Sequence, residues 1–272
     1  ALLYESWWKT RGLREWRLAP DTGAAPALLR EASYEDRYAD PGSPVLRTDE
    51  RGFSRLLTTG DGQTIYRIGD GASAEGDRPF LDRQDLATGR TERLFRSEAP
   101  WYEAPIALLD PDASRILTLR ESPTDPANVL LRRLGDGAAT VALSDFPHPT
   151  PALRGVSKEQ IRYVREDGVE LTADLYLPPG YDAGRDGPLP MLMWAYPREF
   201  KSADAASQVR GSPYRFNRVS YWGPLAFLAR GYAVAVTDYE GLGTAGVHPY
   251  LNRASQGHAM LDLARATRSL GT

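Results

Sequence analysis

The first 150 residues alternate short apolar runs with turn-forming residues, and this pattern predicts strands rather than helices. The turns at 60–62 and 69–71, for example, each read Gly-Asp-Gly and each follow such a run. Runs at intervals of roughly 8–12 residues, separated by turn residues, are typical of an all-β sandwich, barrel or propeller. The predicted strands include residues 54–58, 63–68, 80–86, 91–95, 115–120 and 129–134.

Two segments have a hairpin pattern that propeller blades often use, in which Asp and small residues end one strand before the next returns. They are residues 85–94 and 109–117. A blade takes about 40–50 residues, so 150 residues hold about three to four blades. That is too few to close a typical ring, and an open set leaves a bare sheet edge. We therefore predict a partial β-propeller truncated at its N-terminus, with a self-contained β-sandwich as the alternative.

The alternation of short apolar runs and turn residues ends at residues 146–151, which contain three prolines. Proline lacks a backbone donor and fixes its own backbone, so this segment is expected to be a stiff linker. Residues 161–165 and 171–177 then alternate apolar and polar positions around Asp167 and Gly168. This arrangement predicts a β-hairpin with a tight turn.

An apolar strand at 188–196, a helix at 221–230 and a second apolar strand at 231–237 follow the hairpin. An antiparallel opening that leads into a parallel strand–helix–strand unit is how α/β-hydrolase sheets begin. We therefore expect two domains. Residues 1–150 are the propeller segment, and residues 151–272 are the N-terminal half of an α/β-hydrolase domain.

The nucleophile turn of α/β hydrolases, Gly-x-Ser-x-Gly, does not occur in the sequence. The chain also begins without Met, and residues 1–8 look like the inside of a strand rather than a signal peptide. We therefore expect the chain to be a piece of a longer hydrolase that is cut before the nucleophile turn. On this interpretation the catalytic Ser, Asp and His lie beyond residue 272.

Composition narrows the chemistry further. The chain carries 33 Lys and Arg against 36 Asp and Glu, a net charge of −3 that indicates no nucleic-acid partner. The absence of Cys excludes disulfides, thiolate catalysis and Cys–zinc sites. The sequence contains no run of about 18 apolar residues, so it predicts no membrane-spanning helix. His148, His248 and His258 lack the spacing of a metal pair, so we expect no metal or other cofactor. Compartment, whether cytoplasm or periplasm or the exterior, and oligomeric state stay open.

Three residues near the first apolar strand of the second domain carry the candidate chemistry. Tyr196 stands at the carboxyl end of the predicted strand, where open α/β sheets bind ligands. A phenol there can donate a hydrogen bond to an oxyanion, or it can cap the core with its hydroxyl in water. Arg198 and Arg210 flank the following loop. They can bind a carboxylate in bidentate fashion, or they can be solvated surface arginines.

Other matches to functional patterns have plainer interpretations. Asp238 begins a glycine-bearing loop whose role in such folds is usually structural. Residues 241–246 fit Gly-x-Gly-x-x-Gly, but a dinucleotide site needs a helix that starts within the glycines, and residues 248–250 contain a proline there. Ser255 resembles half of a nucleophile turn, but it is better interpreted as the N-cap of a final helix at 258–270.

Several long motifs resemble the prolyl oligopeptidase family, specifically its glutamyl-endopeptidase-like branch. The likeness covers about residues 1–234. The motifs that carry it are EDRYADPGSP at 35–44, RESPT at 120–124, FPHP at 146–149, LYLPPGY at 175–181, WAYPREFK at 194–201 and QVRGSP at 208–213.

This resemblance implies a β-propeller that screens access to an α/β-hydrolase peptidase domain. It also implies serine-peptidase chemistry on a peptide substrate, in that branch on the carboxyl side of glutamate. Tyr196 matches the tyrosine whose hydroxyl helps to form the oxyanion hole in the wider family. The family's catalytic Ser, Asp and His match no residue of this chain.

After residue 234 the sequence departs from that branch. TDYEGLGT at 237–244 and VHPYL at 247–251 resemble secreted lipases of the α/β-hydrolase fold. The change falls on a strand that both groups share. The expected fold class is therefore the same for both, but the substrate class is undecided. The alternatives to a peptidase are therefore a lipase or esterase, and a non-catalytic propeller binding protein with a hydrolase remnant.

Overall fold

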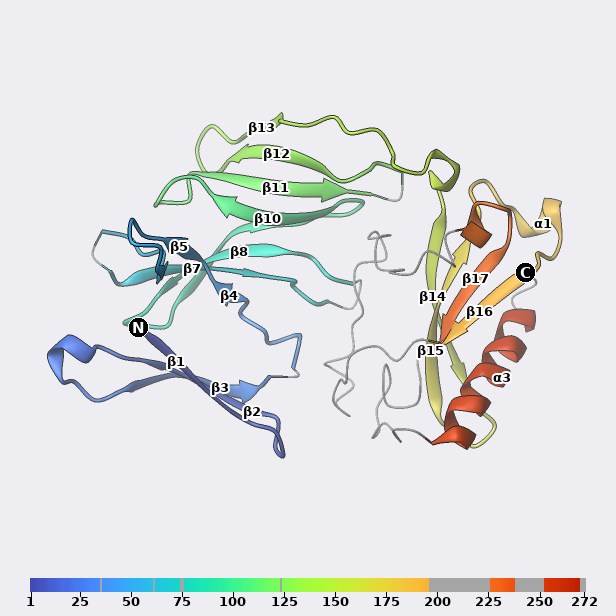
Figure 1. The fold of residues 1–272 in the computed structure, drawn as a ribbon, viewed down its shortest axis with the longest axis horizontal. Coiled ribbons are helices and arrows are strands. Elements are labelled where there is room, and N and C mark those ends of the chain that lie inside the picture. The colour runs from blue at the N-terminus through green and yellow to red at the C-terminus, as the bar shows by residue number, and fades with distance from the viewer. Residues whose placement is uncertain are drawn as a thin grey trace. The chain divides into compact units, whose positions relative to one another are not determined.

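The computed structural model describes residues 1–34, 36–60, 62–73, 76–122, 124–195, 226–237 and 252–269. Strands dominate these residues and helices are few (Figure 1). The chain divides into two compact units. The first contains Ala1–Ser73, Asp77–Arg120 and Asn128–Asp145, and the second contains Ala74–Gly76, Glu121–Ala127 and Phe146–Thr272.

The first unit is built from sheets of neighbouring strands. The sheet orders are β1-β2-β3, β4-β7-β8-β9 and β10-β11-β12-β13, and β5 and β6 form a separate hairpin. Pairing is antiparallel throughout the first two sheets and from β11 to β13. The elements are β1 (Leu2–Trp7), β2 (Gly12–Arg17), η1 (Pro20–Thr22), β3 (Ala27–Ser33), β4 (Ser43–Pro44), β5 (Leu46–Thr48), β6 (Ser54–Leu56), β7 (Thr64–Gly69), β8 (Phe80–Asp85), β9 (Thr91–Arg96), β10 (Tyr102–Leu108), β11 (Arg115–Glu121), β12 (Asn128–Arg133) and β13 (Ala139–Ala142).

Strand β7 is buried on both of its faces because a neighbouring sheet covers each one. Tyr66 packs with Ile116 of β11 in an apolar cluster between the second and third sheets. Arg67, the next residue, points the opposite way and pairs with Glu15 of β2 in the first sheet. The three sheets therefore contact one another in chain order. Stacked sheets of three or four strands are the units of propellers, and the partial propeller itself stays a prediction.

The predicted hairpin at 85–94 is confirmed. Asp85 ends β8, and its Oδ1 accepts hydrogen bonds from the backbone N–H groups of Ala87 (2.8 Å) and Thr88 (2.7 Å). Gly89 then takes a positive φ of 71°, a conformation that glycine adopts without a steric penalty. The side-chain acceptor and the glycine together turn the chain back into β9.

The second unit contains a mixed sheet of order β14-β15-β17-β16. Strand β15 is antiparallel to both β14 and β17, whereas β16 and β17 are parallel. The antiparallel hairpin followed by a parallel pair is the order that the sequence predicts. The elements are η2 (Pro151–Leu153), β14 (Ser157–Val164), β15 (Glu170–Leu177), α1 (Ala183–Asp186), β16 (Met191–Ala195), β17 (Ala233–Thr237) and α3 (Arg253–Ser269).

Apolar clusters cover both faces of this sheet, which explains why β15 is buried along almost its whole length. On one face, Ala173 and Leu175 of β15 and Ala235 of β17 pack against Leu263 of α3. On the other face, a cluster forms around Tyr176 of β15. Its other buried members are Leu153, Val156, Leu228 and Val234.

The final helix begins earlier than the sequence predicts. The prediction placed its first residue at His258 and its N-cap at Ser255, but α3 starts at Arg253. Asn252 caps it, because its Oδ1 accepts hydrogen bonds from the N–H groups of Ala254 (3.0 Å) and Ser255 (3.2 Å). Ser255 lies in the first turn. Within the described part of the chain, no helix is both long and apolar enough to cross a membrane.

Candidate functional site

The parallel strands β16 and β17 end side by side, and we call the place where they end the carboxyl edge. Their register pairs Met191 with Ala233 at the start and Ala195 with Thr237 at the end. Open α/β sheets bind their ligands at this edge, because the loops that leave parallel strands there converge. The carboxyl edge is therefore the candidate active site of the second unit.

The predicted site residues follow these strands in the chain. Tyr196 comes directly after Ala195, the last residue of β16. Tyr196, Arg198 and Arg210 themselves lie outside the described residues, so their assignments stay predictions. The register of β16 with β17 also places the end of β16 beside Thr237, the residue before Asp238.

Thr237 at the carboxyl edge is held by a side chain from two strands away. The hydroxyl of Tyr163, on β14, lies 2.6 Å from Thr237 Oγ1 in a hydrogen bond. Thr237 is completely buried. Burial raises the pKa of the Tyr163 phenol to about 12, so Tyr163 is neutral at physiological pH. The bond therefore persists across the working range of an ordinary enzyme.

Helix α3 adds a charge to the surroundings of this phenol. Asp262 of α3 is buried and forms an ion pair with Arg265, one turn further along the helix. Its negative charge adds to the effect of burial in raising the pKa of Tyr163. A deprotonated Tyr163 would face this carboxylate, so the geometry favours the neutral hydroxyl.

Ser255 has a structural role in the described part of the chain. It is buried in the first turn of α3, and its Oγ accepts a long hydrogen bond from Arg165 Nη1 at 3.4 Å. Arg165 also donates to both carboxylate oxygens of Asp167 at 2.8 and 2.7 Å. These contacts join the β14–β15 turn to the start of α3. They do not supply a base that would activate the serine hydroxyl.

A buried ion pair lies on the opposite face of the same sheet. Lys158 Nζ and Asp174 Oδ2 are 3.3 Å apart, and both side chains are less than one-tenth exposed. The ammonium group also lies 5.6 Å from the centre of the Tyr176 ring. The Asp174 carboxylate and the Tyr176 ring together offset the cost of burying the lysine ammonium group. This pair holds β14 against β15.

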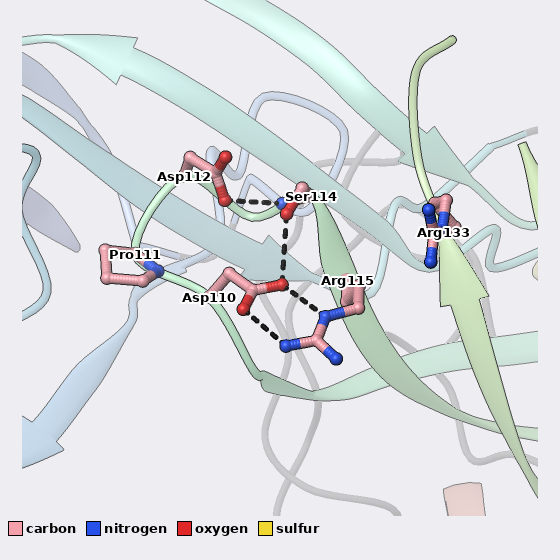
Figure 2. A pocket seen from close by; sticks show the side chains of 6 residues that line it. All are labelled: Asp110, Pro111, Asp112, Ser114, Arg115 and Arg133. Carbon is pink, nitrogen blue, oxygen red and sulfur yellow. Dashed lines mark hydrogen bonds and ion pairs between the residues drawn. The ribbon is translucent and has the colours of Figure 1, made fainter. Parts of the chain in front are cut away.

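A hollow of about 500 Å³ lies in the first unit, at the turn between β10 and β11. Figure 2 shows the Arg115 guanidinium turned toward the carboxylate of Asp110, with 2.7 Å hydrogen bonds to each of its oxygens. Arg115 holds the pKa of Asp110 down to about 2. Asp110 is thus ionised and already occupied at neutral pH, so it is unsuited to general acid or base work. The remaining lining residues are Pro111, Asp112, Ser114 and Arg133.

The histidines that the structure describes carry no catalytic geometry. His148 accepts a hydrogen bond at Nδ1 from the backbone N–H of Thr150, 3.1 Å away. His258 is exposed on the first half of α3, and His248 lies outside the described residues. Among the described residues, no three His, Asp or Glu side chains gather in a way that would hold a metal ion.

Sequence reasoning located the strands of the candidate site but missed the contact that joins them. The predicted strands 161–165 and 231–237 contain Tyr163 and Thr237. These residues are 74 positions apart in the chain. Only the strand order β14-β15-β17 brings them together, and no local motif encodes that order.

Comparisons with known proteins point to peptidases. The family of X-Pro dipeptidyl-peptidases (S15 family) matches residues 167–248, and this range includes β15, β16 and β17. A probable chloroplastic glutamyl endopeptidase of Oryza sativa subsp. japonica is 45% identical over 247 residues, and one of Arabidopsis thaliana is 43% identical over 248 residues. Each match covers 86% of this chain and 26% of the relative. The chain thus spans about a quarter of the length of these relatives.

The fold also resembles a solved peptidase. Oligopeptidase B from Leishmania major matches with a TM-score of 0.52 at 13% identity, over 99% of this chain and 36% of that one. An identity this low indicates a shared fold only. The sequence matches confirm the resemblance that the motifs predicted, and the fold match agrees with the expected fold.

Proposed function

From this likeness to the prolyl oligopeptidase-like serine peptidases, we propose that the chain is part of an enzyme that cleaves peptide bonds after glutamate. The observation that carries the proposal is its identity to two relatives named as glutamyl endopeptidases, which extends across 86% of the chain. The match of residues 167–248 to a second peptidase family supports the hydrolytic class independently.

We propose a different role for each of the two parts of the chain. Residues 1–150 form part of a β-propeller that restricts access of substrates. Residues 151–272 form the N-terminal half of an α/β-hydrolase domain that carries one side of the active site. The chain-order stacking of the sheets in the first unit and the order β14-β15-β17-β16 in the second support this assignment.

The proposed reaction is acyl transfer to a serine. The serine Oγ attacks the backbone carbonyl carbon of the glutamate, and a histidine accepts the serine proton. The carbonyl oxygen becomes an oxyanion, to which the Tyr196 hydroxyl donates a hydrogen bond. Collapse expels the amine, which takes the proton from histidine, and water then releases the acid by the same steps in reverse. No residue of this chain is assigned as the Ser, His or Asp.

Specificity for glutamate is proposed to come from arginine. Arg198 and Arg210 flank the segment after Tyr196 in the sequence, and a guanidinium binds a carboxylate with two parallel hydrogen bonds. Replacing both by Ala is expected to abolish the preference for Glu over Gln at the cleaved position. A variant that keeps the preference would exclude both residues from this role.

Tyr196→Phe in a full-length version of the protein tests the proposed mechanism. Loss of one oxyanion donor typically lowers kcat by ~10²–10³, and the measurement is p-nitroaniline release from a peptide ending in Glu-p-nitroanilide. Tyr181→Phe is the matched control, since this phenol donates to the carbonyl of Gly187 in the α1 turn. An unchanged rate for Tyr196→Phe would remove the residue from the oxyanion hole.

A second candidate is a lipase or esterase, favoured by residues 237–251 alone. A panel of p-nitrophenyl esters run beside the Glu peptide separates the two. Turnover of esters with no hydrolysis of the peptide would favour the second candidate and reject the first.

A further inference from the structure

The end of β17 is fixed from outside its own strand pair. Thr237 is the last residue of β17, and the phenol of Tyr163 reaches its Oγ1 from β14. Strand β15 lies between these two strands in the sheet. The hydrogen bond therefore spans an intervening strand and ties the end of the parallel pair to the antiparallel hairpin.

The surroundings make this tie rigid. Tyr163 packs against the cluster of Ala173, Leu175, Ala235 and Leu263, which joins the sheet to α3. Thr237 is completely buried, so solvent does not compete for its hydroxyl. Breaking this neutral hydrogen bond is costly on the Thr237 side, because the hydroxyl of Thr237 stays buried.

The register transmits the position of Thr237 to the neighbouring strand. Ala195 is the Cα partner of Thr237 in the parallel pair. Tyr196 follows Ala195 by one peptide bond. We therefore expect a displacement of Thr237 to act on Ala195, the residue before the proposed oxyanion donor in the sequence. Small displacements matter at such a site, since a misplacement of about 1 Å can lower a rate by as much as ~10².

We propose that Tyr163 is a positioning residue that aligns the oxyanion donor Tyr196 through its hydrogen bond to Thr237. This inference rests on the proposed function. Tyr163 touches neither the substrate nor the reacting atoms, so its loss should act on the chemical step and leave substrate binding alone.

The experiment compares Tyr163→Phe, Thr237→Val and the double variant in a full-length version of the protein. We expect each single variant to lower kcat on the Glu-p-nitroanilide peptide by about tenfold with KM unchanged, less than the ~10²–10³ of removing a donor outright. The double variant should be no slower than the slower of the two single variants, because all three lose the bond between Tyr163 and Thr237. Thr237→Ser, which keeps the hydroxyl, should restore most of the rate.

Active enzyme is counted by a fluorophosphonate label, so that loss of folded protein does not imitate loss of kcat. Tyr181→Phe again serves as the control for removing a partly buried phenol hydrogen bond elsewhere in the second unit. Equal kcat per labelled site in the wild type and all variants would overturn the inference, as would additive losses in the double variant. If Tyr163→Phe does not fold, the comparison of Thr237→Val with Thr237→Ser decides alone. A wild type that labels but hydrolyses no Glu peptide would reject the proposed function instead.

Discussion

The buried ion pair between Glu15 and Arg67 gives the sharpest test of how the first unit is held together. Arg67 Nη2 lies 2.5 Å from Glu15 Oε1, and both side chains are 2% exposed. Two other partners satisfy the guanidinium: Nε donates to Gln84 at 2.6 Å, and Nη1 donates to the Gly42 carbonyl at 3.2 Å. Glu15→Gln removes only the negative charge and leaves this positive charge buried without a counter-ion.

The expected loss of stability follows from burial. Removing one partner of a buried pair costs about 3–5 kcal/mol, and we expect about 3 kcal/mol here because Gln still offers an acceptor. With a urea dependence of about 2 kcal/mol per M, the midpoint of unfolding falls by about 1.5 M. The matched control is Glu31→Gln in the same sheet. Its partner Arg14 is 39% exposed and Glu31 is 58% exposed, so water screens this ion pair and its loss should shift the midpoint only slightly.

Urea titration of the 272-residue chain, followed by tryptophan fluorescence, makes the comparison. Trp7, Trp8 and Trp16 report on the sheet that holds both glutamates. Midpoints for Glu15→Gln and Glu31→Gln that agree within 0.3 M, on the order of the error of about 10% in such measurements, would refute the argument from burial.

Two further predictions concern turns of the first unit. Asp110→Asn should destabilise the unit less at pH 2.5 than at pH 7. The folded pKa of about 2 lies below the unfolded value near 3.9, so the contribution is complete above the unfolded value and fades as pH falls through about 2. Melting temperatures of both proteins across this range measure it, and a difference as large at pH 2.5 as at pH 7 would contradict it. Gly71→Ala should cost about 3 kcal/mol, because its Cβ would lie 2.0 Å from the Arg78 carbonyl oxygen at a φ of +65°. Gly89→Ala, with a similar φ and no neighbour within 4 Å, should cost only about 1 kcal/mol, and equal melting temperatures for the two would reject the steric argument.

The strands of both units were predictable because alternation and turn residues act locally. The hairpin at 85–94, for instance, needs only Asp85 and Gly89 within five positions of each other. The start of the last helix was predicted wrongly for the opposite reason. Ser255 and Asn252 are both good caps, and in the structure Asn252 caps the helix while Ser255 contacts Arg165, 90 positions away in the chain.

The residues of the candidate site also differ in how far the sequence predicts them. Tyr196, Arg198 and Arg210 were assigned from motifs and stay predictions, because the structure does not describe them. Tyr163 and Thr237 were not assigned at all. Their contact depends on the strand order, which is decided by packing on both faces of the sheet. Packing joins residues that are distant in the chain, so no short segment of the sequence predicts it.

The pairing of Glu15 with Arg67 also affects how faithfully the sheets assemble. Apolar faces are interchangeable, so hydrophobic collapse alone would allow a sheet to stack on a wrong neighbour. A wrong neighbour would leave the Arg67 charge dehydrated and uncompensated, at a cost of several kcal/mol. The correct stacking contains the carboxylate at the required depth. The ion pair therefore disfavours misassembled intermediates more strongly than it stabilises the finished molecule.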